Sequence, residues 1–321
     1  MTKAGMVTFV GKPNAGKSTL MNRIVGEKLS IVSPKPQTTR DRVVGIRSTT
    51  DVQMIILDTP GLLEPGYALQ ESMKQTALRA LTEADVIVHV HDVNDGDAPS
   101  LKDAAKLGSE PHAPVILALN KSDQLGKRDR ERARSGQKIG GASKTAEGIA
   151  VGGEGAAADA GDSSRPNRML VSALSGDGVP ELIEKIESLL PESPFYYPAD
   201  EVSTLPVRFF TAELVRETVL EQLRDEVPYS IACEVEEFRE ERSPKFIRAV
   251  IYVERESQKG IVVGAKGASI KKIGEASRRK IELFIGDRVY LELHVKVLPN
   301  WRRDSSALSR FGYQLLKGKS Q

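Results

Sequence analysis

The chain has 321 residues, of which 40% are hydrophobic and 28% are charged. This length predicts two domains, because domains usually hold about 100 to 200 residues. No apolar run approaches the roughly 18 residues that a membrane-spanning helix needs, so a membrane-spanning protein is excluded. The first residues lack the apolar core of a secretory signal, so no such signal is expected. The single cysteine, Cys233, excludes an internal disulfide, fits a cytoplasmic protein and is expected to be a small buried hydrophobe.

The formal net charge of +2 hides an asymmetry along the chain. Residues 259–321 carry 14 lysines or arginines and 5 acidic residues, a net charge of +9, whereas residues 1–258 carry −7. A basic region of this kind indicates an anionic partner at the C-terminal end.

Residues 6–190 alternate short apolar segments with helical patterns. Strands that are apolar on both faces are typical of parallel sheets covered by helices, so this region is predicted to have the α/β fold class with a mostly parallel sheet. The expected strands are 6–10, 53–58, 86–92, 114–120 and 167–171, and the expected helices are 17–26, 68–82, 99–107 and 179–190.

Residues 11–18, GKPNAGKS, match the phosphate-binding pattern GxxxxGK[ST] between a strand and a helix. In such a loop the glycines let backbone N–H groups turn toward the phosphates, and the helix N-terminus adds its positive end. Lys17 is expected to reach the β- and γ-phosphates, and Ser18 to bind Mg²⁺. The motif therefore predicts a nucleotide site.

Two further segments complete the expected phosphate side. Asp58 ends an apolar strand and begins the sequence DTPG, which places it for a magnesium contact and Gly61 for an amide contact with the γ-phosphate. By itself DTPG is an ordinary turn. The polar stretch 33–42, SPKPQTTRDR, is predicted to be an irregular loop whose Thr39 hydroxyl completes the magnesium shell and releases the loop after hydrolysis.

The base is identified by the sequence NKSD at residues 120–123, which ends another strand. A carboxylate at Asp123 accepts hydrogen bonds from N1–H and the 2-amino group of guanine, which adenine lacks. The sequence SAL at residues 172–174 is a weaker pattern that places a backbone N–H near the guanine carbonyl. We therefore expect GTP and GDP as ligands.

These motifs define the predicted nucleotide site. Lys17, Thr39, Asp58 and Gly61 are expected to act in catalysis, and the predicted magnesium ligands are Ser18, Thr39 and Asp58. The full set of expected GTP- and GDP-binding residues is Gly11, Lys12, Pro13, Asn14, Ala15, Gly16, Lys17, Ser18, Thr38, Thr39, Asp58, Thr59, Pro60, Gly61, Leu62, Asn120, Lys121, Ser122, Asp123, Ser172, Ala173 and Leu174.

Two segments interrupt the pattern. Residues 135–167 are dominated by Gly, Ala, Ser and Asp and have too few large apolar groups to offset the entropy of ordering, so they are predicted to be a disordered insertion, with a partner-binding loop as the alternative. Residues 191–206 hold four prolines, which predicts a linker. The expected domains are 1–190 and 207–321.

The second region reads as a small α+β domain. Its expected order is a helix at 209–223, strands at 230–238 and 245–254, a glycine-bearing loop, a basic helix at 269–283 and a strand at 289–298. The loop contains GxxG, whose glycines let the backbone approach a single-stranded sugar-phosphate chain. Although charges on such a helix are often only a solvated face, the expected RNA-binding residues are Gly264, Ala265, Lys266, Gly267, Lys271 and Lys272.

The motifs GKPNAGKS, PQTTR, DTPGL, NKSD and SAL, in this order, resemble the Era family of translation-factor-related GTPases. The GxxG region resembles a KH domain of the bacterial type. The resemblance covers nearly the whole chain, including the C-terminal WRRD sequence, and implies a GTPase domain followed by a smaller KH-type RNA-binding domain. The insertion at 135–167 departs from the family.

The resemblance also implies functional details. Asn14 would help to hold a potassium ion, and Thr38 and Thr39 would be the switch threonines. Leu62 stands where Ras-like enzymes have a water-orienting glutamine, which predicts slow intrinsic hydrolysis. The implied partners are the 3′ end of 16S ribosomal RNA and the small ribosomal subunit, with a role in maturation of that subunit, and a monomeric cytoplasmic protein is expected.

Two other functions remain open from the sequence. The first is a peripheral-membrane or cell-cycle signalling GTPase whose basic tail contacts anionic lipid of the inner membrane. The second is a structural RNA-binding protein without hydrolysis, which the intact Lys17, Ser18 and Asp58 disfavour.

Two further groups of residues are interpreted without a metal site. His89 and His91 alternate on one strand without a cysteine nearby, so packed histidines are favoured over a metal site. An acidic run includes five glutamates. It is interpreted as a solvated edge that repels misplaced RNA, with a magnesium site as the alternative. Its members are Glu234, Glu236, Glu237, Glu240 and Glu241.

Overall fold

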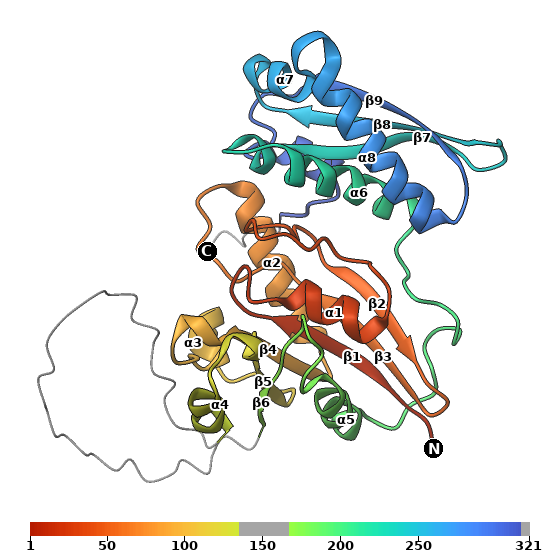
Figure 1. Cartoon of the computed structure of the whole chain (residues 1–321). Helices are drawn as coiled ribbons and strands as arrows, with labels where there is room; N and C mark the ends of the chain where they lie inside the picture. Colours follow the sequence, from red (N-terminus) through yellow and green to blue (C-terminus); the bar gives the residue numbers. More distant parts are fainter. Residues whose placement is uncertain (135–166, 316–321) are drawn as a thin grey trace, which may run out of the picture.

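The computed structural model describes residues 1–134 and 167–315. These residues form two separate sheets, one from each half of the chain, with the second stacked over one end of the first (Figure 1). No helix in the described ranges is long and apolar enough to cross a membrane.

The first sheet has the strand order β2-β3-β1-β4-β5-β6, and all neighbours are parallel except β2 and β3. The prediction of a mostly parallel sheet is therefore confirmed. Its strands are β1 (Lys3–Val10), β2 (Val43–Ser48), β3 (Val52–Asp58), β4 (Val86–Asp92), β5 (Val115–Asn120) and β6 (Arg168–Leu170).

Helices cover both faces of this sheet, which explains why its central strands are apolar throughout. One face packs against α1 and α5, and the other against α2 and α3. The helices of this half are α1 (Lys17–Val25), α2 (Ala68–Glu83), α3 (Leu101–Ala105), α4 (Lys127–Arg134) and α5 (Val179–Leu189).

Strand β2 was not expected from the sequence. It contains Gly45, which weakens a strand signal, but a Cβ at this position would lie 2.8 Å from Val25 of α1. The close approach of the helix therefore requires glycine. On its outer edge β2 is bound by the proline-rich segment, because the Ile46 N–H donates to the Val202 carbonyl at 2.8 Å. That segment lies along the sheet edge rather than free of it (Figure 1).

The second sheet has the order β7-β8-β9, with β7 antiparallel and β9 parallel to β8. Its apolar core joins the strands to α6, α7 and α8. The elements are α6 (Val207–Gln222), β7 (Ala232–Arg239), β8 (Lys245–Val253), α7 (Glu256–Val263), α8 (Ala268–Ile285), β9 (Val289–Val297) and α9 (Ser305–Arg310). The prediction of a small α+β unit is confirmed.

Three helices, α4, α7 and α9, were not expected from the sequence. The segment expected to be a glycine-bearing loop begins with helix α7, which includes Gly260 and is started by a capping box between Arg255 and Gln258. The charged helix α4 was also missed, because it has no apolar face. Most of the insertion predicted at 135–167 lies outside the described residues.

Candidate functional site

The phosphate-binding loop lies between β1 and α1, where two glycines are required by geometry. Gly11 has φ +149°, and a Cβ there would lie 2.1 Å from the Val90 carbonyl oxygen of β4. Gly16 has φ +96°, and a Cβ would lie 2.1 Å from the Asn120 amide nitrogen of β5. The loop is therefore packed against two neighbouring strand ends, which fixes its backbone beneath the phosphate position.

Lys17 begins α1 and is 5% exposed. Its Nζ donates to the Gly11 carbonyl at 3.1 Å and the Lys12 carbonyl at 2.9 Å. Burial lowers the pKa of this ammonium to about 8, although the nearby carboxylate of Asp58 opposes the shift. A buried cation held by carbonyls at this place is suited to bind phosphate oxygens, which would stabilise its charge.

The three predicted magnesium ligands meet at the end of β3. Ser18 Oγ donates to Asp58 Oδ2 at 2.7 Å and lies 3.0 Å from Thr39 Oγ1, and Thr39 Oγ1 lies 3.3 Å from the same carboxylate oxygen. Asp58 Oδ1 is buried without a hydrogen-bond partner in the described part of the chain. Burial raises the pKa of Asp58, with Lys17 acting in the opposite direction.

This donor set fits magnesium. Mg²⁺ prefers hydroxyl and carboxylate oxygens, and a buried carboxylate with one unpaired oxygen is stabilised by a cation. Ser18, Thr39 and Asp58 are therefore the residues that would hold the ion.

The segment after Asp58 crosses close to the phosphate loop. A Cβ at Gly61 would lie 2.6 Å from the Pro13 nitrogen, so only glycine fits. Thr59 Oγ1 donates to the Phe9 carbonyl at 2.7 Å, which fastens the segment to β1. Leu62 is 9% exposed and packs in an apolar cluster with α2 and α3, so its side chain has no role in orienting water.

The part of the site that is expected to hold guanine is assembled from three distant segments. Asn120 donates to the Ala15 carbonyl at 2.8 Å and accepts from the Ala173 N–H at 2.8 Å. Ser172 Oγ donates to Asp123 Oδ1 at 2.6 Å. Arg23 of α1 also donates to the Ala173 carbonyl at 2.6 Å. The weak SAL pattern is therefore joined to NKSD and to the phosphate loop, and Arg23 is a contact that sequence reasoning missed.

A pocket of about 330 Å³ lies over the phosphate loop. It brings together the loop, the stretch 31–39, Gly61 and Lys121. Asn14 is exposed at this loop, and its Nδ2 donates to the Pro34 carbonyl at 2.9 Å. Leu174, which is 74% exposed, and Asp123 do not line the pocket.

The second candidate site begins at the GAKG loop between α7 and α8. Gly264, Lys266 and Gly267 all have positive φ, of +72°, +51° and +79°. A Cβ at Gly264 would lie 2.6 Å from Ser269 Cβ, whereas at Gly267 it would meet nothing within 4 Å. The loop thus turns sharply and leaves exposed backbone at the N-terminus of α8, a favourable place for a phosphate.

A groove of about 390 Å³ runs between α8 and the edge strand β9. Basic side chains and apolar side chains share it, which suits phosphates and bases respectively. Its lining residues are Ile270, Lys271, Gly274, Glu275, Arg278, Tyr290, Leu291 and Leu293.

The groove divides the basic residues of α8. Lys271 and Arg278 line it, whereas Lys272 does not. Lys280 faces α6 instead, where it pairs with Glu217 at 2.8 Å and Glu221 at 2.7 Å. Tyr290, which is 58% exposed, and the neighbouring leucines of β9 were missed, although an exposed aromatic residue on a strand was a usable signal.

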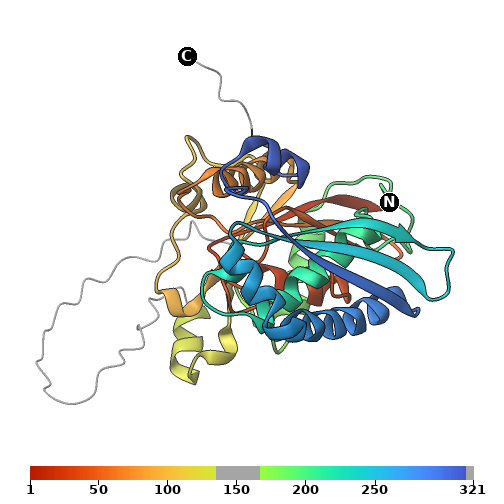
Figure 2. The same ribbon diagram turned by 90° about the horizontal axis from the view of Figure 1, so that it is seen from above.

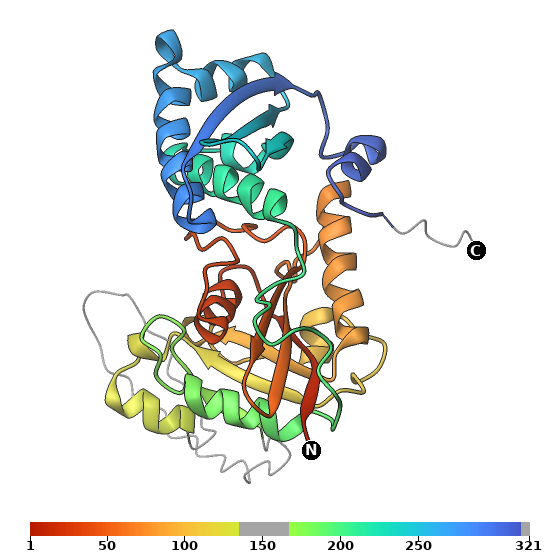
Figure 3. The ribbon, with the colours of Figure 1, turned by 90° about the vertical axis from the view of Figure 1, so that its right-hand side faces the viewer.

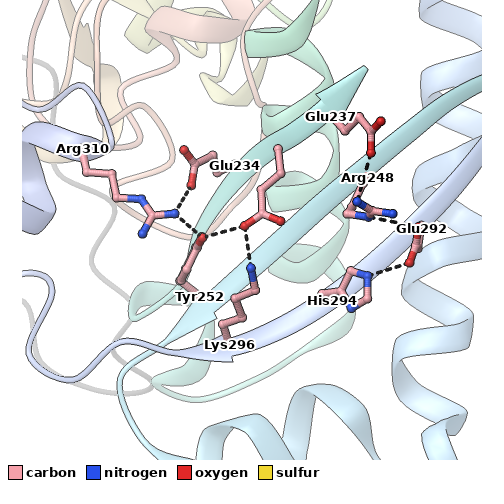
Figure 4. A network of polar contacts seen from close by, with 9 residues as sticks. Glu234, Glu237, Arg248, Tyr252, Glu292, His294, Lys296 and Arg310 are labelled. Carbon is pink, nitrogen blue, oxygen red and sulfur yellow. Dashed lines mark hydrogen bonds and ion pairs between the residues drawn. The ribbon is translucent and has the colours of Figure 1, made fainter. Parts of the chain in front are cut away.

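The acidic run lies on and just after β7, which is an edge strand as expected, and Glu240 and Glu241 are exposed. Three of the other carboxylates are paired. Glu234 pairs with Arg310 at 2.8 Å and Glu237 with Arg248 at 3.0 Å (Figure 4), and Glu236 pairs with Lys296 at 2.6 Å. The basic partners come from β8, β9 and α9, three elements whose position beside β7 the sequence did not reveal.

The remaining weak candidates are also structural. Among the described residues no group of three or more potential metal ligands occurs. His89 and His91 are buried, and burial lowers the pKa of His89 to about 4. Cys233 is half-buried against the second core rather than fully buried, and desolvation raises the pKa of its thiol to about 12.

Known families match both halves of the chain. The family model described as "50S ribosome-binding GTPase" matches residues 6–121, and the model described as "KH domain" matches residues 226–302.

Curated relatives match almost the whole chain. GTPase Era of Carboxydothermus hydrogenoformans is 40% identical over 313 residues, which are 97% of this chain and 98% of that protein. GTPase Era of Thermotoga maritima is 40% identical over 312 residues, 97% of each chain.

Solved structures agree over the same length. An Aquifex aeolicus Era variant bound to GDP·AlF4⁻ has a TM-score of 0.83 and 36% identity, and the match covers 98% of this chain and all of that one. A structure of Era in complex with MgGDPNP and nucleotides 1506–1542 of 16S ribosomal RNA gives the same values.

Proposed function

The chain belongs to the Era family of GTPases, and from this premise we propose that it is a GTP-hydrolysing switch that binds the 3′ end of small-subunit ribosomal RNA and acts in maturation of that subunit. The hydrolytic half of the proposal depends on one observation above all. Ser18, Thr39 and Asp58 converge within 3.3 Å beside a buried lysine, although they come from three separate segments.

The residues of the pocket have separate roles in this reaction. Lys17 holds the β- and γ-phosphates and stabilises the negative charge that develops as the bond to the leaving group breaks. The Gly61 amide, brought close by contact with Pro13, donates toward the γ-phosphate. Magnesium, when bound, neutralises charge between the β- and γ-phosphates.

Slow intrinsic hydrolysis follows from Leu62, the residue after Gly61. Positioning of the attacking water is a large part of catalysis in this reaction, and the buried Leu62 supplies none. We propose that a potassium ion beside Asn14 provides additional positive charge. This residue is suitably placed because it is exposed at the phosphate loop and contacts the carbonyl of Pro34.

Phosphate release tests the hydrolytic half. The full chain with magnesium should release phosphate from GTP and not from ATP, and potassium in place of sodium should accelerate the release. Equal release from both nucleotides would contradict the role of Asp123. No release from GTP under either salt would contradict hydrolysis and would favour a structural RNA-binding protein.

The RNA half rests on the KH domain and on the full-length likeness to Era. The description of the first family model names the 50S particle, but that model covers residues 6–121 alone. The Era structure that matches 98% of the chain holds nucleotides 1506–1542 of 16S ribosomal RNA. The groove beside GAKG, with Lys271, Arg278 and exposed Tyr290, supports a single-stranded RNA ligand at the same domain.

Crosslinking to total cellular RNA in the presence of a non-hydrolysable GTP analogue tests this target. Crosslinks should concentrate at the 3′ end of the small-subunit RNA. Crosslinks spread evenly over all RNA would contradict the ribosomal role.

A paired binding experiment separates RNA from lipid. Replacement of both Gly264 and Gly267 by Asp should abolish RNA binding and should weaken binding to anionic vesicles far less, because lipid attraction needs charge but not this loop. The reverse order would favour a peripheral-membrane GTPase. We propose that the protein works in the cytoplasm as a monomer, and sedimentation of the full chain checks the latter.

A further inference from the structure

The switch stretch, residues 33–42 with Thr38 and Thr39, is bound by the KH half of the chain, residues 207–315. The Lys35 ammonium donates to the carbonyls of Leu220 and Leu223 at the C-terminal end of α6. The Arg216 guanidinium of the same helix donates to the Thr38 carbonyl. A cation at a helix C-terminus is favourable, so the first of these contacts adds to the attachment.

Arg40 makes the deepest contact of this stretch. It is 4% exposed, and its guanidinium donates to the carbonyls of Ile231, Tyr229 at 3.1 Å and Pro228 at 3.4 Å. These carbonyls belong to the turn between α6 and β7. Because buried carbonyls without a donor are costly, withdrawal of Arg40 would leave this turn destabilised.

Trp301 lies beside Arg40 and is completely buried. The Arg40 guanidinium lies 5.8 Å from the centre of its ring, and the indole N–H donates to the Ser230 carbonyl at 2.8 Å. The same apolar cluster contains Leu69 and Met73 of α2. Trp301 therefore lies where the switch stretch, α2 and the second sheet meet.

Helix α2 follows the DTPG segment, so it brings the second nucleotide-sensing segment to this place. The Leu69 N–H donates to the Arg302 carbonyl at 3.0 Å, and Ser72 Oγ donates to the Gln314 carbonyl at 2.8 Å. The N-terminal end of α2 and helix α9 lie side by side in two views of the molecule (Figure 2 and Figure 3). The switch stretch and helix α2, which follows DTPG, thus both reach the KH half beside Trp301.

We propose that Arg40 is the residue that couples the nucleotide state to the KH half, and that Trp301, the only tryptophan of the chain, responds to that state. The inference rests on the proposed switch function. Thr39, one of the magnesium ligands, is the neighbour of Arg40 in the chain. Movement of Thr39 away from the metal therefore moves Arg40 away from its three carbonyls.

The Arg40 contacts differ between the two nucleotide states, and this difference links GTP binding to RNA binding. A ligand shifts a conformational equilibrium only through a difference in its interactions with the two states, and the coupling works equally in both directions. The Arg40 contacts form when Thr39 is held beside Ser18 and Asp58, so GTP favours the KH position seen in this structure. RNA that binds better to this position raises the affinity for GTP by the same factor.

Tryptophan fluorescence of the full chain tests the proposal directly. Emission of Trp301 should differ between magnesium with GDP and magnesium with GDPNP, and Arg40→Met should remove the difference. The affinity for an RNA of the 16S 3′ end should differ at least about fivefold between the two nucleotides in the wild type, the lower range of allosteric coupling, and should become equal in the variant.

Arg42→Met is the matched control. Arg42 lies two residues further on and pairs with Glu83 inside the first half, so it should keep the wild-type difference. Arg40→Lys is the second test variant, because it retains the charge while a single ammonium cannot reproduce the fork of donors. GDP affinity and a melting curve show whether each variant is folded.

The outcomes separate the two proposals. If the wild type hydrolyses GTP and binds the RNA but the folded Arg40 variants keep its nucleotide difference, the coupling inference is wrong and the proposed function stands. If the wild type binds no RNA, the proposed function is wrong, and the fluorescence difference still decides the inference. Emission that is identical with both nucleotides in the wild type overturns the inference.

Discussion

The two anion-binding sites of the molecule hold charge in opposite ways. The proposed nucleotide pocket holds one buried lysine, Lys17, and one buried carboxylate, Asp58, close to the phosphate loop. The groove of the KH half uses basic side chains spread along an exposed helix. A single small anion is thus bound by burial and fixed geometry, and a polyanion by distributed charge.

This difference has physical consequences. Buried charges are screened little by salt but are strongly affected by desolvation, whereas exposed charges lose much of their attraction in salt. The nucleotide site should therefore respond to substitution and pH, and the groove to salt. Four experiments test this contrast.

Removal of the buried cation should have the largest effect. Lys17→Met should lower the rate of GTP hydrolysis by about 10²- to 10³-fold, the usual cost of losing one preorganised group that stabilises the transition state. Single-turnover phosphate release measures it. Lys106→Met removes an exposed lysine of the same half, 65% exposed and paired with Glu64, and should leave the rate unchanged. A loss of less than tenfold for Lys17→Met would contradict the assigned role.

Salt should weaken RNA binding strongly and GTP binding weakly. With about three phosphate contacts, from Lys266, Lys271 and Arg278, RNA affinity should fall roughly 20-fold between 50 and 200 mM salt. Fluorescence anisotropy with a short single strand measures the slope. Lys271→Ala should reduce the slope by about 0.7, whereas Lys280→Ala, whose lysine is paired with α6, should not. Equal slopes for RNA and GTP would remove the contrast.

An added carboxylate at the exposed loop should repel RNA. Gly267→Asp should weaken RNA binding about tenfold, equivalent to about 1.4 kcal/mol. Gly286→Asp is a close control, because both glycines cap α8, with φ +79° and +74°, and neither has an atom within 4 Å of the added Cβ. The two substitutions carry the same backbone strain, so only the first should affect RNA. Equal losses would indicate damage to the helix instead.

The smallest expected effect is the pH dependence of GTP binding. Burial lowers the pKa of Lys17 to about 8, and bound phosphate raises it again, so GTP binding takes up a proton above pH 8. Affinity is then complete well below pH 8, is about halved at pH 8, and falls by about fourfold from pH 7.0 to 8.5. Calorimetry in buffers of different ionisation enthalpy counts the proton. Absence of proton uptake at pH 8.5 would contradict the lowered pKa.

The sequence predicted the nucleotide site better than the RNA site. The phosphate loop, DTPG and NKSD are contiguous motifs that each follow a strand, and parallel strands bring their carboxyl ends to one edge. The structure accordingly joins Ser18, Thr39 and Asp58, although their roles stay predictions. In the groove, by contrast, three of the eight lining residues come from β9, whose position beside α8 is decided by the pairing of β9 with β8.

The elements that sequence analysis missed lack a clear hydrophobic period. Strand β2 and helix α7 both contain glycine, and helix α4 has no apolar face, so periodicity gave no signal for them. Packing decided the first, because α1 approaches Gly45 closely, and a capping box decided the second. The pairing of the acidic run was missed for a similar reason: its basic partners outside β7 lie 11 to 76 residues away in the chain.

The sequence by itself determined the fold class, the family resemblance and the local chemistry, because hydrophobic period and short motifs act over a few residues. Only the tertiary structure decided how the two halves meet. Arg40 ends the PQTTR motif and Trp301 begins the WRRD sequence, 261 residues further on, and neither motif shows that the two side chains lie together where the switch stretch joins the KH half. Contacts of this kind depend on how whole elements pack, and no local pattern of residue types records them.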